Sequence, residues 1–405
     1  MNILFINHYA GSPTMGMEYR PYYLAKEFVK TGHNVSIIGA SFSHVRNIQP
    51  TVKEDLSLEL IDNVAYYWIK TPAYRGNILR IINILVFILK LYFYRRKISK
   101  ITKPDLVIAS STYPLDIYAA RRISKISGAK LIFEVHDLWP LTPMTIGGYS
   151  KYHPYIYLMQ RAECYAYKHS YKVISLLGNA REHMVVHGLD PDKFIHIPNG
   201  FDRDEYQLMQ GNVPVEHLQK IENLKKDGKI LIGYTGGHAI SNAMHSFVST
   251  AHLFRNDSRV FFVSVGNGPC KKELQLQAGN LLNILFLPPV PKKSVHQLLP
   301  LFDILYVGFA KSEIHKFGIS PNKLIDYMLA AKPVILSAEV ENEIVEKVGC
   351  GITVPAENPA AIYAAISEML KLSEAERLEM GSRGRNYALK EMDYKELAGR
   401  FLNSI

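Results

Sequence analysis

The chain has 405 residues, of which 48% are hydrophobic and 21% charged. This length suits two or three globular domains, and the composition excludes a disordered protein. The first residues, 1–7, lack a basic region and a small-residue cleavage site, so we expect a buried strand and not a signal peptide. Cys164, Cys270 and Cys350 are far apart without metal-ligand spacing, which favours buried thiols in a reducing compartment.

The net charge of +10 comes entirely from the first half of the chain. Residues 1–200 contain 24 Lys and Arg against 14 Asp and Glu, whereas residues 201–405 contain 23 of each. Between Asp62 and Asp105 there are nine basic residues and no acid. Such asymmetry indicates an anionic partner. The sequence contains no nucleic-acid motif, so we expect a membrane surface and no nucleic acid.

The first half alternates strands with helices. We expect strands at 2–7, 35–39, 105–109, 130–134, 172–175 and 194–200, and helices at 18–30, 115–127, 155–168 and 179–187. The loop 8–17 contains Gly11 and Gly16, which let a ligand approach the backbone, although it lacks the G-x-G-x-x-G spacing. His136 and Asp137 follow the strand 130–134 at the edge where α/β sheets bind ligands, so they are candidates for catalysis or orientation. The alternative is an ordinary surface histidine.

Residues 77–97 predict a long apolar helix with one narrow polar stripe. The stripe consists of Arg80, Asn83, Lys90, Tyr94 and Lys97. The uninterrupted apolar run is shorter than the ~20 residues that span a bilayer. The pattern favours a helix lying in the membrane interface with basic residues at headgroup level, and the run 95–97 adds positive charge. A core helix packed on a sheet is the alternative.

The polar stretch 201–229 predicts a domain boundary, after which the alternation restarts. We expect strands at 230–234, 260–265, 283–287, 304–307 and 351–354, and helices at 242–254, 270–278, 358–371, 374–390 and 394–403. Glycine loops follow the first two of these strands, at 235–238 and 266–269. Alternation on both sides of the boundary predicts two parallel-sheet α/β domains facing a cleft.

The segment 317–335 predicts a loop, a helix and a strand. Ser320 suits the N-cap and Pro321 the first helical position. The free N–H groups of such a helix start suit a phosphate. Lys323 adds a cation there, and Asp326, one turn further, can meet the hydroxyls of an attached ribose. The segment therefore predicts capture of a sugar nucleotide, with an ordinary capped helix as the alternative.

Taken in order, these motifs resemble the glycosyltransferases of family 4, in the two-Rossmann-domain (GT-B) class. The resemblance runs over nearly the whole chain. It rests on the early glycine loop, the 136–137 loop and the segments 197–202, 265–269 and 318–323. The strongest likeness is to bacterial O-antigen and capsule enzymes of the N-acetyl-L-fucosamine transferase type, which share the patterns at 8–13 and 18–22.

The resemblance implies two Rossmann-like, doubly wound domains: an acceptor domain over 1–200 and a nucleotide-sugar donor domain over 201–390. A C-terminal helix within 391–405 would pack back on the first domain. The implied reaction is metal-independent and needs no cofactor: a sugar, such as an N-acetylated hexosamine or deoxyhexosamine, passes from a UDP-sugar with retention. The implied acceptor is a polyprenyl-diphosphate-linked glycan of O-antigen, lipopolysaccharide or capsule synthesis. The enzyme would be cytoplasmic, held at the inner face of the bacterial cell membrane by 77–97.

The resemblance also assigns roles to residues. His136 matches the family's histidine near the donor sugar, and we expect Asp137 and Glu18 to act with it in catalysis. Arg20 and His8 are expected acceptor contacts. The expected donor contacts are Gly16, Gly236, Gly237, Gly266, Gly268, Gly318, Ile319, Ser320, Asn322, Lys323 and Asp326.

Two family features are missing. Asp326 matches the second acid of the E-x7-E motif, but the first acid falls on Gly318, so the backbone of residues 318–319 or the carboxylate of Glu313 must replace it. The diphosphate-binding Arg/Lys pair expected around 237–242 is absent, which leaves Lys323 and backbone N–H groups as substitutes. These gaps keep open the alternative of a non-catalytic nucleotide-binding subunit docked on a membrane. A second alternative, a UDP-sugar 2-epimerase, shares the same architecture.

Overall fold

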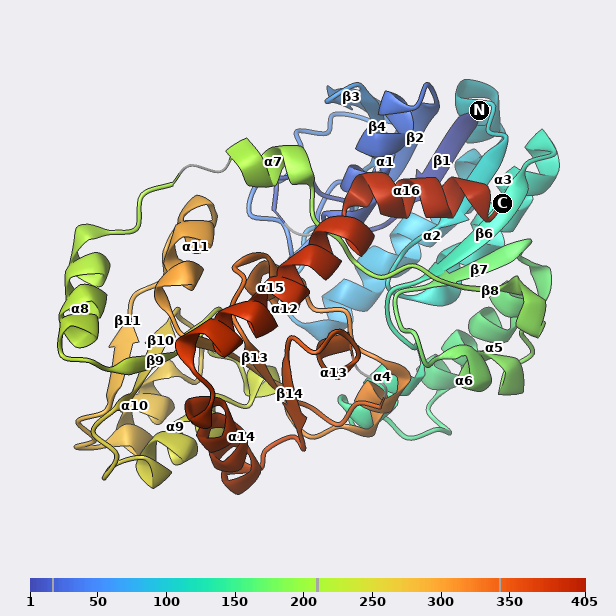
Figure 1. Ribbon diagram of the computed structural model, residues 1–405. Coiled ribbons are helices and arrows are strands. Elements are labelled where there is room, and N and C mark those ends of the chain that lie inside the picture. Colours follow the sequence, from blue (N-terminus) through green and yellow to red (C-terminus); the bar gives the residue numbers. More distant parts are fainter. Residues whose placement is uncertain (17, 209–210, 342–343) are drawn as a thin grey trace. The chain divides into compact units, whose positions relative to one another are not determined.

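The computed structural model describes residues 1–16, 18–208, 211–341 and 344–405 (Figure 1). Met17, which ends the predicted loop 8–17, and residues 209–210 of the predicted boundary stretch lie outside the described residues. The chain divides into two compact units. Unit 1 comprises Met1–Asn199, Phe317–Ile319 and Tyr394–Ile405, and unit 2 comprises Gly200–Lys316 and Ser320–Asp393.

Unit 1 is built on an eight-stranded sheet with the strand order β3-β4-β2-β1-β5-β6-β7-β8. Its strands are β1 (Asn2–Ile6), β2 (Asn34–Ala40), β3 (Ser57–Ile61), β4 (Val64–Ile69), β5 (Leu106–Ala109), β6 (Lys130–Val135), β7 (Lys172–Ser175) and β8 (Phe194–His196). Neighbouring strands are parallel except for β3 and β4, which form an antiparallel hairpin. Sequence analysis missed this hairpin. Its turn residues Asp62 and Asn63 both have left-handed backbones, as a two-residue hairpin turn requires.

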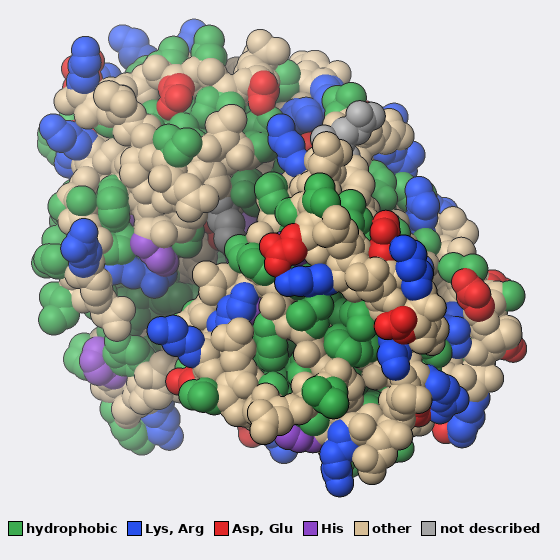
Figure 2. Space-filling model, turned by 90° about the vertical axis from the view of Figure 1, so that its left-hand side faces the viewer, with side chains coloured by type: hydrophobic (Ala, Val, Ile, Leu, Met, Phe, Trp, Pro, Cys, Tyr) green, Lys and Arg blue, Asp and Glu red, His purple; other side chains and the backbone are tan. Residues whose placement is uncertain are grey.

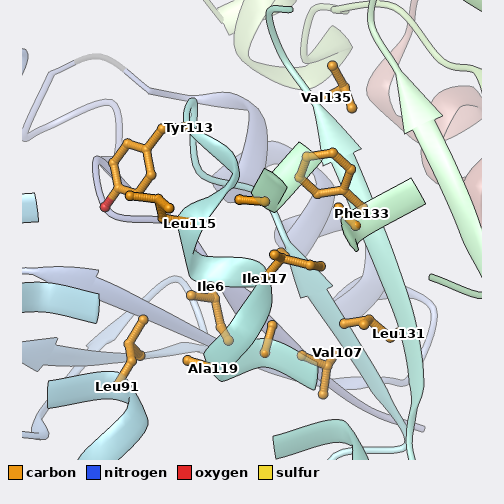
Figure 3. Packing of buried hydrophobic residues seen from close by; sticks show 14 of the residues in the cluster. Ile6, Leu91, Val107, Tyr113, Leu115, Ile117, Ala119, Leu131, Phe133 and Val135 are labelled. Atoms are coloured by element: carbon orange, nitrogen blue, oxygen red, sulfur yellow. The ribbon is translucent and has the colours of Figure 1, made fainter. Parts of the chain in front are cut away.

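Helices cover both faces of the unit 1 sheet. They are α1 (Arg20–Lys30), α2 (Asn77–Thr102), α3 (Ile117–Ser127), α4 (Leu141–Thr145), α5 (Pro154–His169), α6 (Arg181–Val186) and α16 (Tyr394–Asn403). Because side chains alternate along a strand, Leu4 and Ile6 join the core under α2, α3 and α5, while Ile3 and Phe5 join the core under α1 and α16. Figure 3 shows the first of these cores.

The C-terminal helix α16 belongs to unit 1, although the chain before it belongs to unit 2. Its buried face includes Tyr394 and Phe401. The Tyr394 ring lies 5.0 Å from that of Tyr23, and the Phe401 ring 5.5 Å from that of Phe28. Helix α16 therefore completes the apolar layer on α1.

Helix α2 is the one helix in the described ranges that is long and apolar enough to cross a membrane, judged by length and composition only. Most of its polar stripe packs against unit 1, and Lys97 is the stripe residue that is exposed. The Asn83 amide donates to the Pro72 carbonyl at 2.7 Å, and the Lys90 ammonium lies 3.0 Å from the Asp55 carboxylate. Asn83 and Lys90 are therefore not free to meet lipid headgroups, whereas Lys97 is exposed and the membrane interpretation stays a prediction for it.

The opposite side of α2 is apolar and exposed. Its largest exposed side chains include Ile78, Leu89 and Phe93, with 77%, 68% and 75% of their surface accessible. The helix buries Ile84, Phe87 and Leu91 against the sheet. It is thus a core helix on one side and an unpaired apolar face on the other.

Unit 2 is built on a six-stranded sheet with the order β11-β10-β9-β12-β13-β14, and all its neighbouring strands are parallel. Its strands are β9 (Ile230–Thr235), β10 (Val260–Val265), β11 (Ile284–Leu287), β12 (Ile304–Gly308), β13 (Val334–Ser337) and β14 (Gly351–Val354). Its helices are α7 (Arg203–Leu208), α8 (Val215–Lys226), α9 (Met244–Leu253), α10 (Lys271–Ala278), α11 (Lys292–Leu298), α12 (Asn322–Leu329), α13 (Ile344–Val348), α14 (Pro359–Lys371) and α15 (Glu374–Glu391). The two sheets confirm the predicted α/β class.

The stretch 201–229, predicted as a loosely patterned boundary, contains the two helices α7 and α8. Five of the twelve residues of α8 are charged, and the helix buries only His217 and Ile221, which lie one turn apart. This sparse apolar pattern explains why sequence analysis missed it. Figure 2 shows that basic and acidic side chains are interspersed on one face of the molecule. In the sequence, by contrast, the run between Asp62 and Asp105 contains basic residues and no acidic ones.

Candidate functional site

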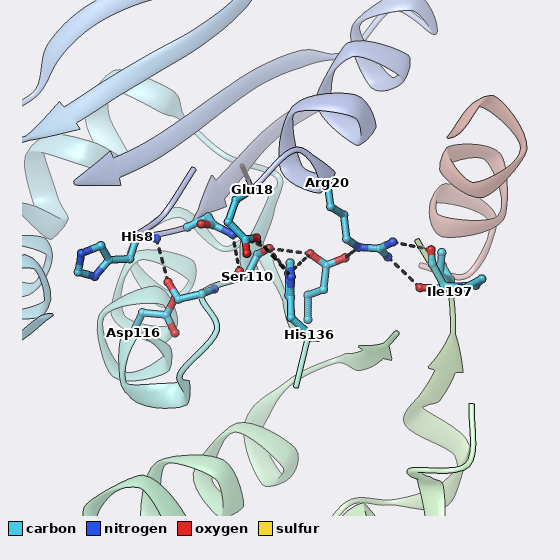
Figure 4. A network of polar contacts seen from close by, with 11 residues as sticks. His8, Glu18, Arg20, Ser110, Asp116, His136 and Ile197 are labelled. Carbon is cyan, nitrogen blue, oxygen red and sulfur yellow. Dashed lines mark hydrogen bonds and ion pairs between the residues drawn. The ribbon is translucent and has the colours of Figure 1, made fainter. Parts of the chain in front are cut away.

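Four polar residues of unit 1 surround His136 at the carboxyl ends of β5 and β6 (Figure 4). We call Glu18, Arg20, Ser110, Glu134 and His136 the His136 cluster. The His136 Nε2 atom lies 3.1 Å from Glu134 Oε2 and 3.0 Å from Ser110 Oγ. Its Nδ1 atom lies 3.7 Å from Glu18 Oε2. Two carboxylates therefore flank the imidazole, one on each ring nitrogen.

The charges of this cluster compensate one another. Burial alone would lower the pKa of His136, but the hydrogen bond to Glu134 and the charges of Glu134 and Glu18 raise it above its usual value. Burial likewise opposes ionisation of Glu134, yet the Arg20 and His136 cations hold its pKa at about 2. The result is a buried carboxylate that stays charged and an imidazole that favours the protonated form.

Arg20 was expected to contact the acceptor, but its guanidinium is fully engaged inside unit 1. It forms an ion pair with Glu134 at 2.9 Å, and it donates to the carbonyls of Ile197 and Pro198 at 2.9 and 2.5 Å. Its side chain is 3% exposed. Arg20 therefore positions Glu134 and the chain after β8, and the prediction of an acceptor contact is wrong.

His8 was the second expected acceptor contact, and it is also buried, with 0% of its surface exposed. Its ring packs between Tyr9 and Phe87 and hydrogen-bonds the Tyr113 hydroxyl. Figure 4 shows the ring pointing away from the His136 cluster. Burial lowers the pKa of His8 to about 3, so it is a neutral core residue and the predicted contact is wrong.

Glu18 and Asp137 occupy different settings. Glu18 is half-buried and has a left-handed backbone, with φ of 55°, which is uncommon outside glycine and is found at functional sites. Asp137 points into its own loop: its Oδ1 atom accepts from Leu138 N at 3.0 Å and from Thr142 Oγ1 at 2.7 Å. Asp137 thus shapes the turn into α4, and only Glu18 of the pair lies beside the His136 ring.

Gly16 lies in the loop before α1, where its N–H donates to the Ser12 carbonyl at 2.9 Å. A Cβ atom there would lie 3.0 Å from the backbone nitrogen of Asn47. The glycine is thus required for the fold of this loop. Its N–H is not available to a donor phosphate.

A second cluster lies in unit 2, around Lys323 at the start of α12. We call Tyr234, Gly236, Gly237, Asn242 and Lys323 the Lys323 cluster. The Lys323 Nζ atom lies 2.9 Å from the Tyr234 hydroxyl and 3.1 Å from Asn242 Oδ1. Its Cε atom lies 2.9 Å from the position that a Cβ of Gly236 would take. The structure therefore places Lys323 directly over the glycine loop that was expected to act with it.

No carboxylate balances the Lys323 ammonium within the described part of unit 2: its two hydrogen-bond partners are neutral. Burial lowers the pKa of Lys323 to about 8. A half-buried cation without a counter-ion is the state that a bound phosphate would relieve.

The two glycine loops of unit 2 pack backbone to backbone. A Cβ at Gly266 would lie 1.9 Å from the Gly236 carbonyl oxygen, and one at Gly268 would lie 2.5 Å from the His238 carbonyl oxygen. The Gly236 N–H donates to the Val265 carbonyl at 3.0 Å, so it is not a free phosphate ligand. For the Gly237 N–H, the described residues offer no acceptor. Of the two expected amide donors, only Gly237 keeps that role.

Helix α12 begins at Asn322, with Pro321 in the N-cap position, so it starts one residue later than predicted. Ser320 precedes it, and Asn322 is exposed at the helix start. Its first turn contains no acidic residue. The helix start is therefore compatible with an anion.

Asp326 lies one turn after Lys323 on the same helix. Burial raises its pKa to about 7, and the Lys292 charge offsets this only in part. Among the described residues no side chain or backbone group donates to its carboxylate. Asp326 is thus available for the hydroxyls that the ribose hypothesis assigns to it.

The residues before α12 explain the missing acid of the E-x7-E motif. Gly318 has a φ of 108°, and a Cβ there would lie 3.0 Å from Gly178 N. A side chain at this position would be strained, whatever its charge. Gly318 and Ile319 cluster with unit 1, and Glu313 is exposed in a 3-10 turn of unit 2.

Sequence analysis missed Glu134, Ser110, Tyr234 and Asn242 as members of these clusters. Glu134 and His136 are two positions apart, so a β-strand places them on the same side. Ser110 follows β5, next to β6 in the sheet. Polar residues at the ends of adjacent parallel strands were the available signal.

Comparisons with known proteins cover both units. Residues 14–205 match a family model described as Glycosyltransferase Family 4, and residues 229–372 match one described as Glycosyl transferases group 1. The search of curated protein sequences returned no match.

Solved structures of similar fold span the whole chain. HepE from Anabaena, in complex with UDP and glucose, is 15% identical with a TM-score of 0.66, over 100% of this chain and 99% of that chain. Sucrose-phosphate synthase from Thermosynechococcus elongatus is 14% identical with a TM-score of 0.70, over 99% and 97%. A trehalose-6-phosphate structure from E. coli bound with UDP-2-fluoro glucose is 12% identical with a TM-score of 0.71, over 99% and 98%.

Proposed function

Because the chain belongs to the glycosyltransferases of family 4, a retaining and metal-independent class with the GT-B fold, we propose that its donor is a UDP-sugar and its acceptor a lipid-diphosphate-linked glycan. HepE was solved with UDP and with UDP-glucose, and the E. coli structure with UDP-2-fluoro glucose. These complexes support a UDP-linked donor here.

The observation that carries the proposal is the uncompensated ammonium of Lys323 over the glycine loop at 236–237. When the bond between the sugar and UDP breaks, negative charge develops on the leaving diphosphate. A fixed ammonium, the Gly237 N–H and the start of α12 would stabilise that charge without rearrangement. Asp326, whose carboxylate has no donor in the described part of the chain, would accept the ribose hydroxyls.

The His136 cluster supplies a different chemistry. His136 is held in place by Glu134 and Ser110, and it favours the protonated form. It would donate a hydrogen bond to an oxygen of the transferred sugar or of its leaving group. Glu18, the more exposed carboxylate at 26% against 0% for Glu134, would accept from a substrate hydroxyl.

The acceptor side of the proposal rests on α2 and on charge. We assign its exposed apolar face, at Ile78, Leu89 and Phe93, to the surface of an anionic bilayer, where an amphipathic helix lies with its apolar side down. The acid-free run from 63 to 104 would add attraction to anionic lipid. A membrane-bound acceptor of this kind belongs to surface polysaccharide synthesis, such as that of O-antigen or capsule. The transferred sugar would be an N-acetylated hexosamine or deoxyhexosamine, and the enzyme would work at the inner face of the cell membrane.

The reaction is tested by incubating the protein with UDP-N-acetylhexosamines, with and without a polyprenyl-diphosphate-linked sugar. The proposal expects release of UDP and a lengthened lipid-linked glycan only when the acceptor is present. Formation of the 2-epimer without acceptor would contradict it. A thermal-shift comparison of UDP, GDP and dTDP sugars identifies the nucleotide, because a ligand that binds the native state stabilises it.

Membrane docking is tested by flotation with vesicles that contain anionic lipid. Leu89→Glu and Phe93→Glu should abolish flotation. Leu282→Glu, at a side chain of unit 2 that is 93% exposed, is the matched control and should float like the parent. Equal flotation of all variants would exclude α2 as the docking face.

A further inference from the structure

Three potential metal ligands of unit 1 lie together outside the His136 cluster. They are Glu163 on α5, His183 on α6 and His187 directly after α6. Their ligand atoms all lie within 4.8 Å of one another. His183 and His187 are four residues apart, so one helical turn brings both rings to the same side. Their ring centroids lie 4.3 Å apart.

Neighbouring groups already fix the orientation of the ligands. Glu163 is 2% exposed, and its two oxygens accept from the Tyr167 hydroxyl at 2.9 Å and from Gln160 Nε2 at 2.6 Å. The Nδ1 atom of His187 donates to the His183 carbonyl at 2.8 Å, which leaves Nε2 as its ligand atom. Metal-binding histidines and carboxylates are typically held by such outer hydrogen bonds.

The His183 Nε2 atom is buried and has no hydrogen-bond partner in the described part of the chain. It lies 3.8 Å from Glu163 Oε1, which is too far for a hydrogen bond. When a zinc ion bonds each ligand at about 2.0–2.2 Å, two of its ligand atoms lie roughly 3.3 Å apart. Small side-chain rotations would therefore bring these ligand atoms into bonding distance of one ion. The gap between a buried imidazole and a buried carboxylate is thus the right size for an ion.

We propose that Glu163, His183 and His187 bind one Zn²⁺ ion that joins α5 to α6. Two imidazoles and one carboxylate are a typical zinc donor set, with water as the fourth ligand. Imidazole nitrogen disfavours Mg²⁺ and Ca²⁺, which prefer oxygen. The ion takes no part in sugar transfer: it stabilises the segment after β7. Cysteine spacing could not predict this site, since its ligands are histidine and glutamate and Glu163 is distant in the sequence.

The site is tested on the full chain after treatment with a chelator. Equilibrium dialysis should give one Zn²⁺ per chain, and Co²⁺ in its place should give the visible absorption of a tetrahedral site. Zn²⁺ at 100 times its Kd should raise the Tm by about 5 °C, whereas Mg²⁺ should not. Affinity should fall in acid, because the histidines must lose their protons to bind.

Variants distinguish zinc bound at this site from zinc bound adventitiously at other histidines. His187→Ala, at a half-buried side chain, and Glu163→Gln should each lower zinc affinity at least 10-fold and abolish the cobalt spectrum. His245→Ala is the matched control: His245 lies 3.2 Å from Glu357 in unit 2, outside any three-ligand group among the described residues, and its loss should change nothing. Zinc binding that is absent in the parent, or undiminished in His187→Ala, would overturn the proposal. If Glu163→Gln fails to fold, the half-buried His187→Ala variant alone decides the test.

Discussion

The His136 cluster and the Lys323 cluster differ in how their charged groups are compensated. In unit 1, Glu134 is buried between Arg20 and His136, and its pKa falls to about 2. In unit 2, Lys323 and Asp326 are half-buried without a close opposite charge, and their pKa values shift towards neutrality, to about 8 and about 7. The first network is complete in the free protein, whereas the second is left for a ligand to complete. The comparison predicts that removing Arg20 from the first network damages stability and that removing Lys323 from the second damages binding.

The largest expected effect is on stability. Arg20→Met should lower the free energy of unfolding by about 3–5 kcal/mol, because it leaves the Glu134 carboxylate buried without its cation. Denaturant unfolding followed by circular dichroism measures this. Adding Glu134→Leu should recover part of the loss. Arg259→Met, which breaks an exposed pair with Asp257, is the control and should leave the free energy of unfolding nearly unchanged.

In the parent protein, the Arg20–Glu134 ion pair should also make the free energy of unfolding depend on pH in acid. Glu134 has a lower pKa when folded, about 2, than its ordinary value of 4.5. Its contribution is therefore complete above pH 4.5 and is lost as the pH falls towards 2. The Arg20→Met variant should lack most of this acid-dependent loss. An unchanged acid profile would mean that Arg20 does not hold the charge of Glu134.

The next effect is on turnover. His136→Gln should lower kcat at least 100-fold, since it removes the protonated group beside the sugar, and should leave the Kd for UDP within about twofold. Transfer assays and calorimetry measure the two quantities. His169→Gln, at a partly exposed ring that ends α5, should behave like the parent. A weakened UDP affinity in His136→Gln would contradict the separation of roles.

Binding in unit 2 should respond less strongly. Lys323→Met should weaken UDP about 10- to 100-fold by removing one charge-assisted contact. Its free energy of unfolding should stay the same or rise, because a half-buried cation without a counter-ion is lost. Lys332→Met, at another half-buried lysine of unit 2 whose pKa is also lowered by burial, is the matched control. If Lys323→Met binds UDP normally, the diphosphate does not contact this ammonium.

The smallest effect is on pH dependence. Above about pH 8 the free Lys323 amine is neutral, so UDP affinity should fall several-fold between pH 7 and 9. Lys323→Arg should remove this decline, because arginine stays protonated. Calorimetry at fixed ionic strength gives the comparison. A decline that persists in Lys323→Arg would assign the titration to another group.

Periodicity predicted most of the fold, since buried parallel strands and amphipathic helices have clear patterns. It failed at the β3–β4 hairpin and at α8, where exposed and charged residues weaken the apolar signal. In the candidate site, motif order located His136 and Lys323. It failed for Arg20 and His8, because a residue next to a motif can point into the core. Side-chain direction depends on long-range packing, which a local pattern does not contain.

The position of α16 also fixes the order in which the protein is completed during synthesis. The chain begins unit 1, passes into unit 2 at Gly200, and supplies the last helix of unit 1 only from Tyr394. Until α16 has left the ribosome, Tyr23 and Phe28 of α1 lack the cover that Tyr394 and Phe401 supply. A nascent chain or a fragment ending at Asn199 should therefore attract chaperones and aggregate, so the domain translated first is the one that matures last.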